Sequence, residues 1–174
     1  GYNIAIGNDA GKYGSNANYS IFMGYAAGEG DSSNTSNNDN NTGIGHMSLK
    51  AITTGDDNLG LGYRTLNANT TGSRNLAIGN NALDLADTES DNIAIGYDAL
   101  GGAVAGGEKN VVIGNYAGDA LDDAGSTVII GYQAASNTSA NVSNSVMMGY
   151  RAGYASEGYA TVLLGYNAGK GANG

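Results

Sequence analysis

The residue best suited to acid–base chemistry in this sequence is His46, the only histidine among 174 residues. It directly follows Gly45 in a repeat whose other copies carry mostly Tyr or Asn at this position. Nucleophilic catalysis of the Ser–His–Asp kind needs three side chains held in register, and one substituted repeat position does not supply them. We therefore expect His46 to be a structural member of an aromatic column. We expect this protein not to be an enzyme and to have no catalytic residues.

One enzymatic alternative stays open, an acyltransferase of the hexapeptide-repeat kind. The segment from Ile95 to Leu100 fits one hexapeptide of such a repeat. The next two hexads, beginning at Gly101 and Gly107, lack the aliphatic residue that marks each hexapeptide. Because only one hexad per coil matches, this alternative is less favoured than a structural role.

Acidic residues gather between the repeats and raise the possibility of calcium binding. They are Asp56 with Asp57, Asp122 with Asp123, and Asp87 with Glu89 and Asp91. The nonapeptide calcium-binding repeat needs Gly-Gly-x-Gly-x-Asp in series, which is absent, and no zinc-ligand spacing occurs. We expect solvated turns that keep the protein soluble, with no metal site and no cofactor, and structural calcium as the alternative.

Six tyrosines share one repeat position, immediately after a glycine. They form a candidate surface ladder of Tyr25, Tyr63, Tyr97, Tyr132, Tyr150 and Tyr166. If the coils stack, these rings come into line along one edge, with the phenol groups reaching water. The structural interpretation is edge packing of aromatic rings, and the functional alternative is a platform for sugars or for a partner surface.

A tandem repeat sets the elements that position these residues. A pattern of aliphatic, any residue, aliphatic and glycine recurs ten times, with its glycines 16 to 21 residues apart, at Gly7, Gly24, Gly45, Gly62, Gly79, Gly96, Gly114, Gly131, Gly149 and Gly165. Period-two alternation in β-favouring residues predicts a short strand that ends at the glycine. About 17 residues per repeat cannot hold two helices, but they fit one coil with two short strands and two turns. The sequence therefore predicts an all-β parallel β-solenoid of about ten coils, forming a single domain over residues 1–174.

The strand residues also predict more than one chain. We expect the aliphatic residues one and three positions before each glycine to fill the coil, which places the residue between them outside. That middle residue is never charged, and in the last four coils the strands are fully apolar. An apolar stripe of this length predicts an oligomer interface, for which the candidates are Phe22, Val112, Ile129, Met147 and Leu163. A symmetric homo-oligomer is the simplest way to cover it.

The composition excludes several classes of partner. The net charge is -9, the pI is about 4.2, and only seven residues are Lys or Arg. Nucleic-acid partners are not expected, because phosphate binding needs clustered basic residues. Membrane insertion of this segment is not expected either, because no apolar run approaches the ~20 residues that a spanning helix needs.

The repeat resembles the head repeats of trimeric autotransporter adhesins and related repeats of phage tail fibres. The likeness lies in Asn-Ile-Ala-Ile-Gly at residues 3–7 and 92–96 and in Asn-Leu-Ala-Ile-Gly at residues 75–79. The resemblance implies a left-handed parallel β-roll, a trimer, and a place outside the cell, on a virion or a bacterial surface. The coils here are longer than is typical of adhesin heads, which favours the fibre relatives.

The function expected from these observations is a structural or binding segment of an extracellular trimeric fibre, a phage tail fibre or an adhesin head, that contacts a host surface or glycan. A loop at residues 29–40 is either a tolerated insertion or a recognition loop. The alternative is the subunit of a self-assembling structural filament. Both ends fall within the repeat without a polar cap, which solitary solenoids need.

Overall fold

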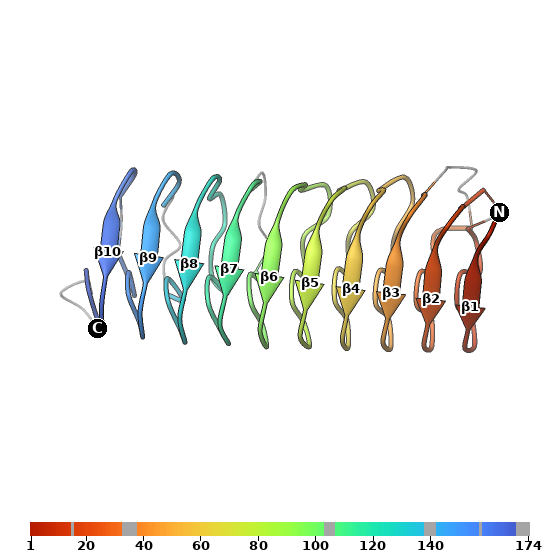
Figure 1. The fold of residues 1–174 in the computed structure, drawn as a ribbon, viewed down its shortest axis with the longest axis horizontal. Coiled ribbons are helices and arrows are strands. Elements are labelled where there is room, and N and C mark those ends of the chain that lie inside the picture. Colours follow the sequence, from red (N-terminus) through yellow and green to blue (C-terminus); the bar gives the residue numbers. More distant parts are fainter. Residues whose placement is uncertain (15, 33–37, 103–106, 138–141, 157, 170–174) are drawn as a thin grey trace.

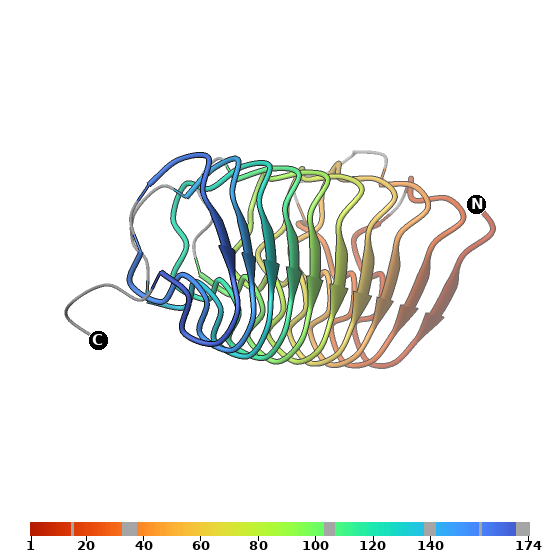
Figure 2. The ribbon, with the colours of Figure 1, turned by 60° about the vertical axis from the view of Figure 1, so that its left-hand side comes forward.

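The computed structural model describes residues 1–14, 16–32, 38–102, 107–137, 142–156 and 158–169. Residues 33–37 of the predicted 29–40 loop lie outside this part of the chain. Ten short strands form one parallel sheet in which sequence order is also spatial order (Figure 1). The chain makes one turn between each strand and the next, which gives a solenoid (Figure 2). The predicted all-β parallel β-solenoid is confirmed.

Each strand has three residues and pairs in register with its neighbours, as in the pairing of Ile4 with Ile21 and Ala5 with Phe22. The strands are β1 (Ile4–Ile6), β2 (Ile21–Met23), β3 (Thr42–Ile44), β4 (Leu59–Leu61), β5 (Leu76–Ile78), β6 (Ile93–Ile95), β7 (Val111–Ile113), β8 (Val128–Ile130), β9 (Val146–Met148) and β10 (Val162–Leu164). At about 4.8 Å between strands, the ten-stranded sheet is roughly 43 Å long.

The described residues contain one strand per coil, so the expectation of two was wrong. The reason is the backbone of the turns, which has non-glycine residues with positive φ at recurring positions in each coil. Around β6 they are Asp91 (φ 64), Asp98 (φ 51) and Leu100 (φ 51). Left-handed residues cannot continue an extended strand, so the chain bends at each of them. The bent segments still stack, because backbone hydrogen bonds join coil to coil, as from Asp98 N–H to the Asn80 carbonyl at 3.0 Å.

From β2 to β9 the middle residue of each strand is buried in the interior of the coils. Of the five residues predicted to form an oligomer interface, four are at most 2% exposed in the single chain and the fifth packs against the core from β10; they are Phe22, Val112, Ile129, Met147 and Leu163. The predicted assignment of the two strand faces was therefore wrong, and these residues belong to the core. The aliphatic residues on either side of them point outward.

Size complementarity explains why the middle residue fits inside. The residue four positions after each glycine also points inward. Where one of the two inward residues of a coil is large, the other is small. Small Ala94 in β6 accompanies the buried Leu100, whereas the larger Phe22 in β2 accompanies Gly28. A Cβ added to Gly28 would lie 2.2 Å from the Phe22 ring, so only glycine fits there. The interior is thus packed by pairs of matched size.

A column of polar side chains is buried beside this core, at the residue that precedes each strand. In the middle coils it is asparagine. The side-chain Oδ1 of Asn75 accepts from the backbone N–H of Asn92 at 3.0 Å, and its Nδ2 donates to the Glu89 carbonyl at 2.8 Å. Asn58 and Asn92 make the equivalent bonds. These bonds satisfy backbone groups that the short strands leave unpaired, which fixes the register of the coils.

Candidate functional site

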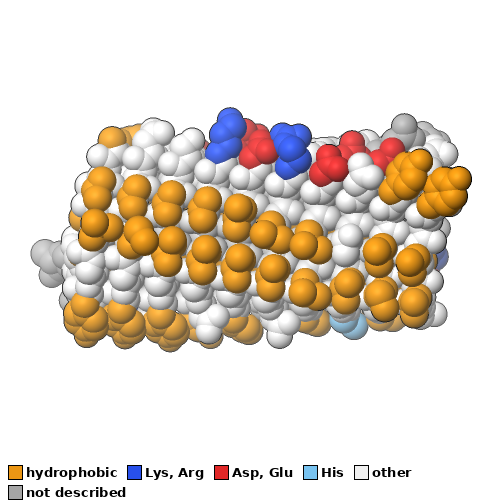
Figure 3. Space-filling view, in the orientation of Figure 1, with side chains coloured by type: hydrophobic (Ala, Val, Ile, Leu, Met, Phe, Trp, Pro, Cys, Tyr) orange, Lys and Arg blue, Asp and Glu red, His pale blue; other side chains and the backbone are white. Residues whose placement is uncertain are grey.

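The outer face of the sheet carries two parallel columns of hydrophobic side chains. They are the first and third residues of each strand, and they follow the rod along its length (Figure 3). Among these twenty outward residues, Thr42 is the one that is not hydrophobic, and none is charged. Large side chains remain exposed in the middle of the rod as well as near the ends, for example Leu61 at 43% and Met148 at 38%.

The outer face is long and apolar. It crosses ten strands, or roughly 43 Å at about 4.8 Å per strand. Soluble monomers rarely expose continuous apolar patches above a few hundred Å², so this face is a candidate association surface.

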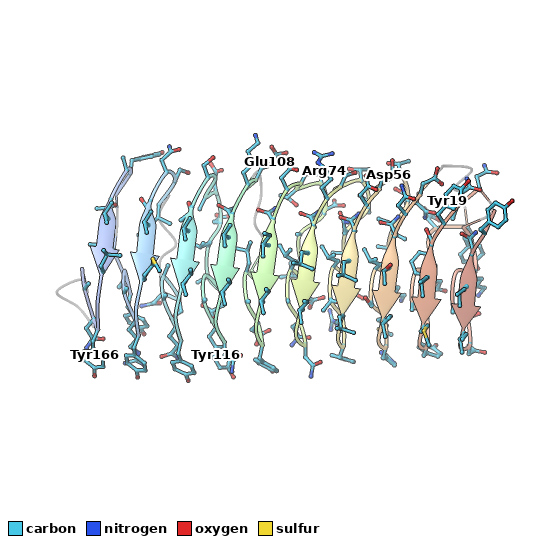
Figure 4. The ribbon with its side chains drawn as sticks, in the orientation of Figure 1. Tyr19, Asp56, Arg74, Glu108, Tyr116 and Tyr166 are labelled. Carbon is cyan, nitrogen blue, oxygen red and sulfur yellow. The ribbon has the colours of Figure 1, made fainter. Side chains whose placement is uncertain are left out.

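An aromatic column follows the edge of the sheet where the strands end. The six predicted ladder tyrosines lie along it, with Tyr166 at the β10 end (Figure 4). The ring centroids of Tyr132 and Tyr150 are 5.7 Å apart, and those of Tyr150 and Tyr166 are 5.1 Å apart, with nearly parallel planes. His46 stacks between the rings of Tyr25 and Tyr63, at 5.1 and 5.3 Å, so its expected place in an aromatic column is confirmed.

Sequence reasoning missed Tyr116, which joins this column (Figure 4). In its coil Asn115 takes the ladder position, and its Oδ1 accepts from the backbone N–H of Tyr97. The ring of Tyr116, one residue later, contacts those of Tyr97 and Tyr132 edge-on at 5.3 and 6.1 Å. A tyrosine immediately after the substituted position was the signal that could have identified it.

The stacking limits what the aromatic column can bind. A sugar packs on the flat face of an aromatic ring, but in the stretches Tyr25–His46–Tyr63 and Tyr132–Tyr150–Tyr166 neighbouring rings stack face to face, with centroids 5.1 to 5.7 Å apart. Tyr116 covers its neighbours edge-on. What remains exposed is chiefly ring edges and phenol groups. The column therefore forms a separate apolar strip parallel to the sheet face, rather than a row of open ring faces.

The opposite edge of the sheet is polar and charged (Figures 3 and 4). Arg74 and Asp91, from adjacent coils, form a two-bonded ion pair with N–O distances of 2.6 and 2.9 Å. Hydrogen bonding to Arg74 holds the pKa of Asp91 below its usual value. The Asp56 carboxylate accepts from the backbone N–H of Asp39, and Asp57 accepts from the side chain of Asn40.

The structure does not bring the acidic residues of the sequence together as a cation site. The Glu89 carboxylate accepts from the backbone N–H groups of Asp87 and Thr88, while Asp122 and Asp123 are exposed. In the described ranges, no group of three or more His, Cys, Asp or Glu side chains could hold a metal ion.

Two half-buried carboxylates lie between the aromatic edge and the far side of the coils. Burial raises the pKa of Asp119 to about 6, and the charge of Asp98 adds to this effect. Burial also raises the pKa of Asp84, which the nearby Arg64 partly offsets through an ion pair of 3.2 Å. These carboxylates follow the glycine of their coils by five residues, a position that the sequence did not mark as functional.

No helix long and apolar enough to cross a membrane occurs in the part of the chain that the structure describes. No protein-family model, curated protein or solved structure matches the chain.

Proposed function

We propose that this chain is a structural segment of an extracellular fibre, in which copies of the solenoid pack side by side through the outer face of the sheet. The observation that carries the proposal is the uncharged, almost wholly hydrophobic surface that runs across ten strands without interruption by a charge. Burial of such a surface is favourable by about 25 cal/mol per Å², so association has a large driving force.

A second copy of the same chain is the partner that best fits this face. The columns repeat every coil, at about 4.8 Å, along the whole rod. Only a surface with the same axial repeat can interdigitate with them from one end to the other, and an identical chain has it by construction. The resemblance to adhesin-head and tail-fibre repeats favours three chains around a common axis and a place on a virion or bacterial surface.

The rest of the architecture suits a stiff spacer that holds a binding surface away from its anchor. Each coil is joined to its neighbours by backbone hydrogen bonds, by the buried asparagine column and by ion pairs such as that between Arg74 and Asp91. This continuous bonding along the axis resists bending. The host surface, or a glycan on it, would be contacted by the outer walls that self-association leaves open.

The solution mass tests this proposal. Sedimentation equilibrium of the chain is expected to give a discrete species of three times 17.4 kDa. Replacing the outward Ile78 and Ile95 together by Glu should yield monomers that keep the β-sheet circular dichroism, because both side chains are only partly buried in the single chain. A control that adds the same charges at Ala120 and Asn137, exposed and away from the strands, should leave the mass unchanged. A stable monomer of the unmodified chain contradicts the proposal.

A further inference from the structure

A groove on the outer wall of the first four coils is separate from the sheet face and from the aromatic column. Its volume is about 590 Å³, and its lining comes from Tyr13 and from parts of residues 29–32, 50–53 and 67–70. None of these residues belongs to a strand. Small-molecule sites in proteins usually have about 300–1000 Å³, so the groove has the size of a ligand site.

The floor of the groove is made by three small residues in adjacent coils. Backbone hydrogen bonds place Gly30, Ala51 and Ala68 in one column, through Gly30 N–H to the Lys50 carbonyl and Ala51 N–H to the Asn67 carbonyl. The same column continues to Tyr13 on one side and to Leu85, which is 49% exposed, on the other. Two bulky side chains therefore close a floor about three coils long, or roughly 14 Å at the coil spacing.

One wall of the groove is charged. The Glu29 carboxylate lies between two lysines, 3.9 Å from Lys12 Nζ and 3.8 Å from Lys50 Nζ. Lys12 also lies over the ring of Tyr13, 5.0 Å from its centroid. Glu29 and Lys50 line the groove, so a carboxylate acceptor and an ammonium donor stand side by side along it.

The other wall carries hydroxyl groups. The Thr53 hydroxyl donates to the carbonyl of Thr70 at 2.8 Å, and the Thr70 hydroxyl donates to the Asp87 carboxylate. The Thr70 hydroxyl oxygen, which donates in this way, keeps acceptor capacity. The two walls together offer donors and acceptors in alternation above an uncharged floor.

This combination selects among ligand classes. The charges of the first wall are already paired, Glu29 with Lys12 and Lys50, so neither an anion nor a cation meets an uncompensated charge there. A purely apolar ligand would leave the charged wall without hydrogen-bond partners. A neutral ligand with many hydroxyl groups satisfies both walls, and its C–H faces can pack on the small residues and on Tyr13. We propose that the groove binds a short neutral oligosaccharide.

The groove would be the part of the proposed fibre that contacts the host surface. For its extracellular setting this inference rests on the proposed function. Isothermal titration of the full chain with neutral trisaccharides built from glucose, galactose or N-acetylglucosamine is expected to show binding of at least one of them. Ala68→Leu should weaken that binding at least tenfold. Leucine is native at the next position of the same column, at Leu85, so this variant is expected to fold.

The matched control is Ala120→Leu, which makes the same change at the same repeat position of a coil outside the groove and should leave binding unaltered. Lys50→Met, which keeps the aliphatic stem but removes the ammonium donor, should also weaken binding. The inference is overturned if none of the trisaccharides binds, if Ala68→Leu binds like the unmodified chain, or if a sulfated trisaccharide binds more tightly than its neutral parent. The mass of the same samples separates the two proposals. If a monomer binds the sugar, only the proposed assembly is contradicted. If a trimer does not bind the sugar, only the proposed groove site is contradicted.

Discussion

Individual residues of this protein are constrained mainly by the distance between coils. The glycine after each strand has a φ of 118° to 141° and, except for Gly165 after β10, lies against the backbone of the same glycine in the next coil. A Cβ on Gly96 would be 2.6 Å from the carbonyl group of Gly114, which is closer than van der Waals contact allows. Glycine is thus required in this column for two reasons: the positive φ of the backbone, and the close approach of the backbone of the next coil.

Two variants separate these requirements. Gly96→Ala should lower the free energy of unfolding by more than about 3 kcal/mol, because strain at φ 140° adds to the clash with the next coil. Gly165→Ala has a similar φ of 121° but no atom within 4 Å of the added Cβ, so its loss should be limited to backbone strain of about 1–3 kcal/mol. Urea denaturation measures both. Equal losses would show that the contact between coils is not what excludes alanine.

Also at the residue scale, the half-buried Asp119 makes the stability of the folded protein depend on pH. Burial raises its pKa from 3.8 to about 6, so between these values the folded protein holds a proton that the unfolded chain has released. The contribution of Asp119 to stability must then fall as the pH rises from about 4 to 6 and stay level above that range. Asp119→Asn should remove this fall and raise the melting temperature at pH 7 by about 1–3 °C, as measured by calorimetry from pH 4 to 8. An unchanged pH profile would contradict the assignment.

At the scale of the coil, the two inward-pointing positions behave as one packing unit. Val112 pairs with Gly118 in one coil, whereas Ala94 pairs with Leu100 in the preceding coil. The two coils fill the same narrow interior with opposite choices. The larger side chain comes from the strand in one coil and from the turn in the other.

A double-mutant cycle tests this coupling. Ala94→Val alone should overfill the coil and cost about 1–3 kcal/mol, and Leu100→Gly alone should leave a cavity and cost about 2–5 kcal/mol. The combined variant reproduces the pair found at Val112 and Gly118, so its loss should be at least 1 kcal/mol smaller than the two single losses together. Denaturant titration of the four proteins gives the coupling energy. Additive losses would mean that the two positions do not share one space.

The sequence contained enough information to predict the repeat, the strand positions and the solenoid, because ten aligned copies average out local ambiguity. It also placed His46 and the six tyrosines correctly. The strand faces were assigned wrongly because the outward residues, such as Ile78 and Ile95, are larger and more uniform than the inward ones. The exchange of size between residues such as Phe22 and Gly28 was the informative pattern, since only residues that share a closed space must compensate for one another.

The groove could not be predicted in the same way. Its small residues, Gly30, Ala51 and Ala68, look like ordinary turn residues in the sequence. Each of them follows the repeat glycine of its coil by six residues, so the repeat does place them in one column with Tyr13 and Leu85. What the repeat does not show is that side chains of the neighbouring positions stand on both sides of this column and leave it open as a groove.

For the molecule as a whole, the outer face of the sheet is the feature that most needs a partner. Its two hydrophobic columns run parallel to the aromatic edge, separated from it by a strip of backbone and other side chains, and the charged edge lies on the opposite side (Figure 3). The groove lies outside the strands. Copies packed through this face would bury the apolar surface and leave the polar walls in water. The net charge of -9 would then keep the proposed assembly soluble.

The labelling rate of a single cysteine at position 95 tests this account most directly, because the chain has no native cysteine to interfere. In Ile95→Cys the thiol points outward from the middle of the sheet. At high protein concentration it should react with a maleimide at least tenfold more slowly than a cysteine at exposed Ala120, and dilution or an added Ile78→Glu change should reduce the difference to the smaller one set by the partial burial of residue 95 in the single chain. Equally fast labelling at both positions, at every concentration, would contradict self-association through the outer face.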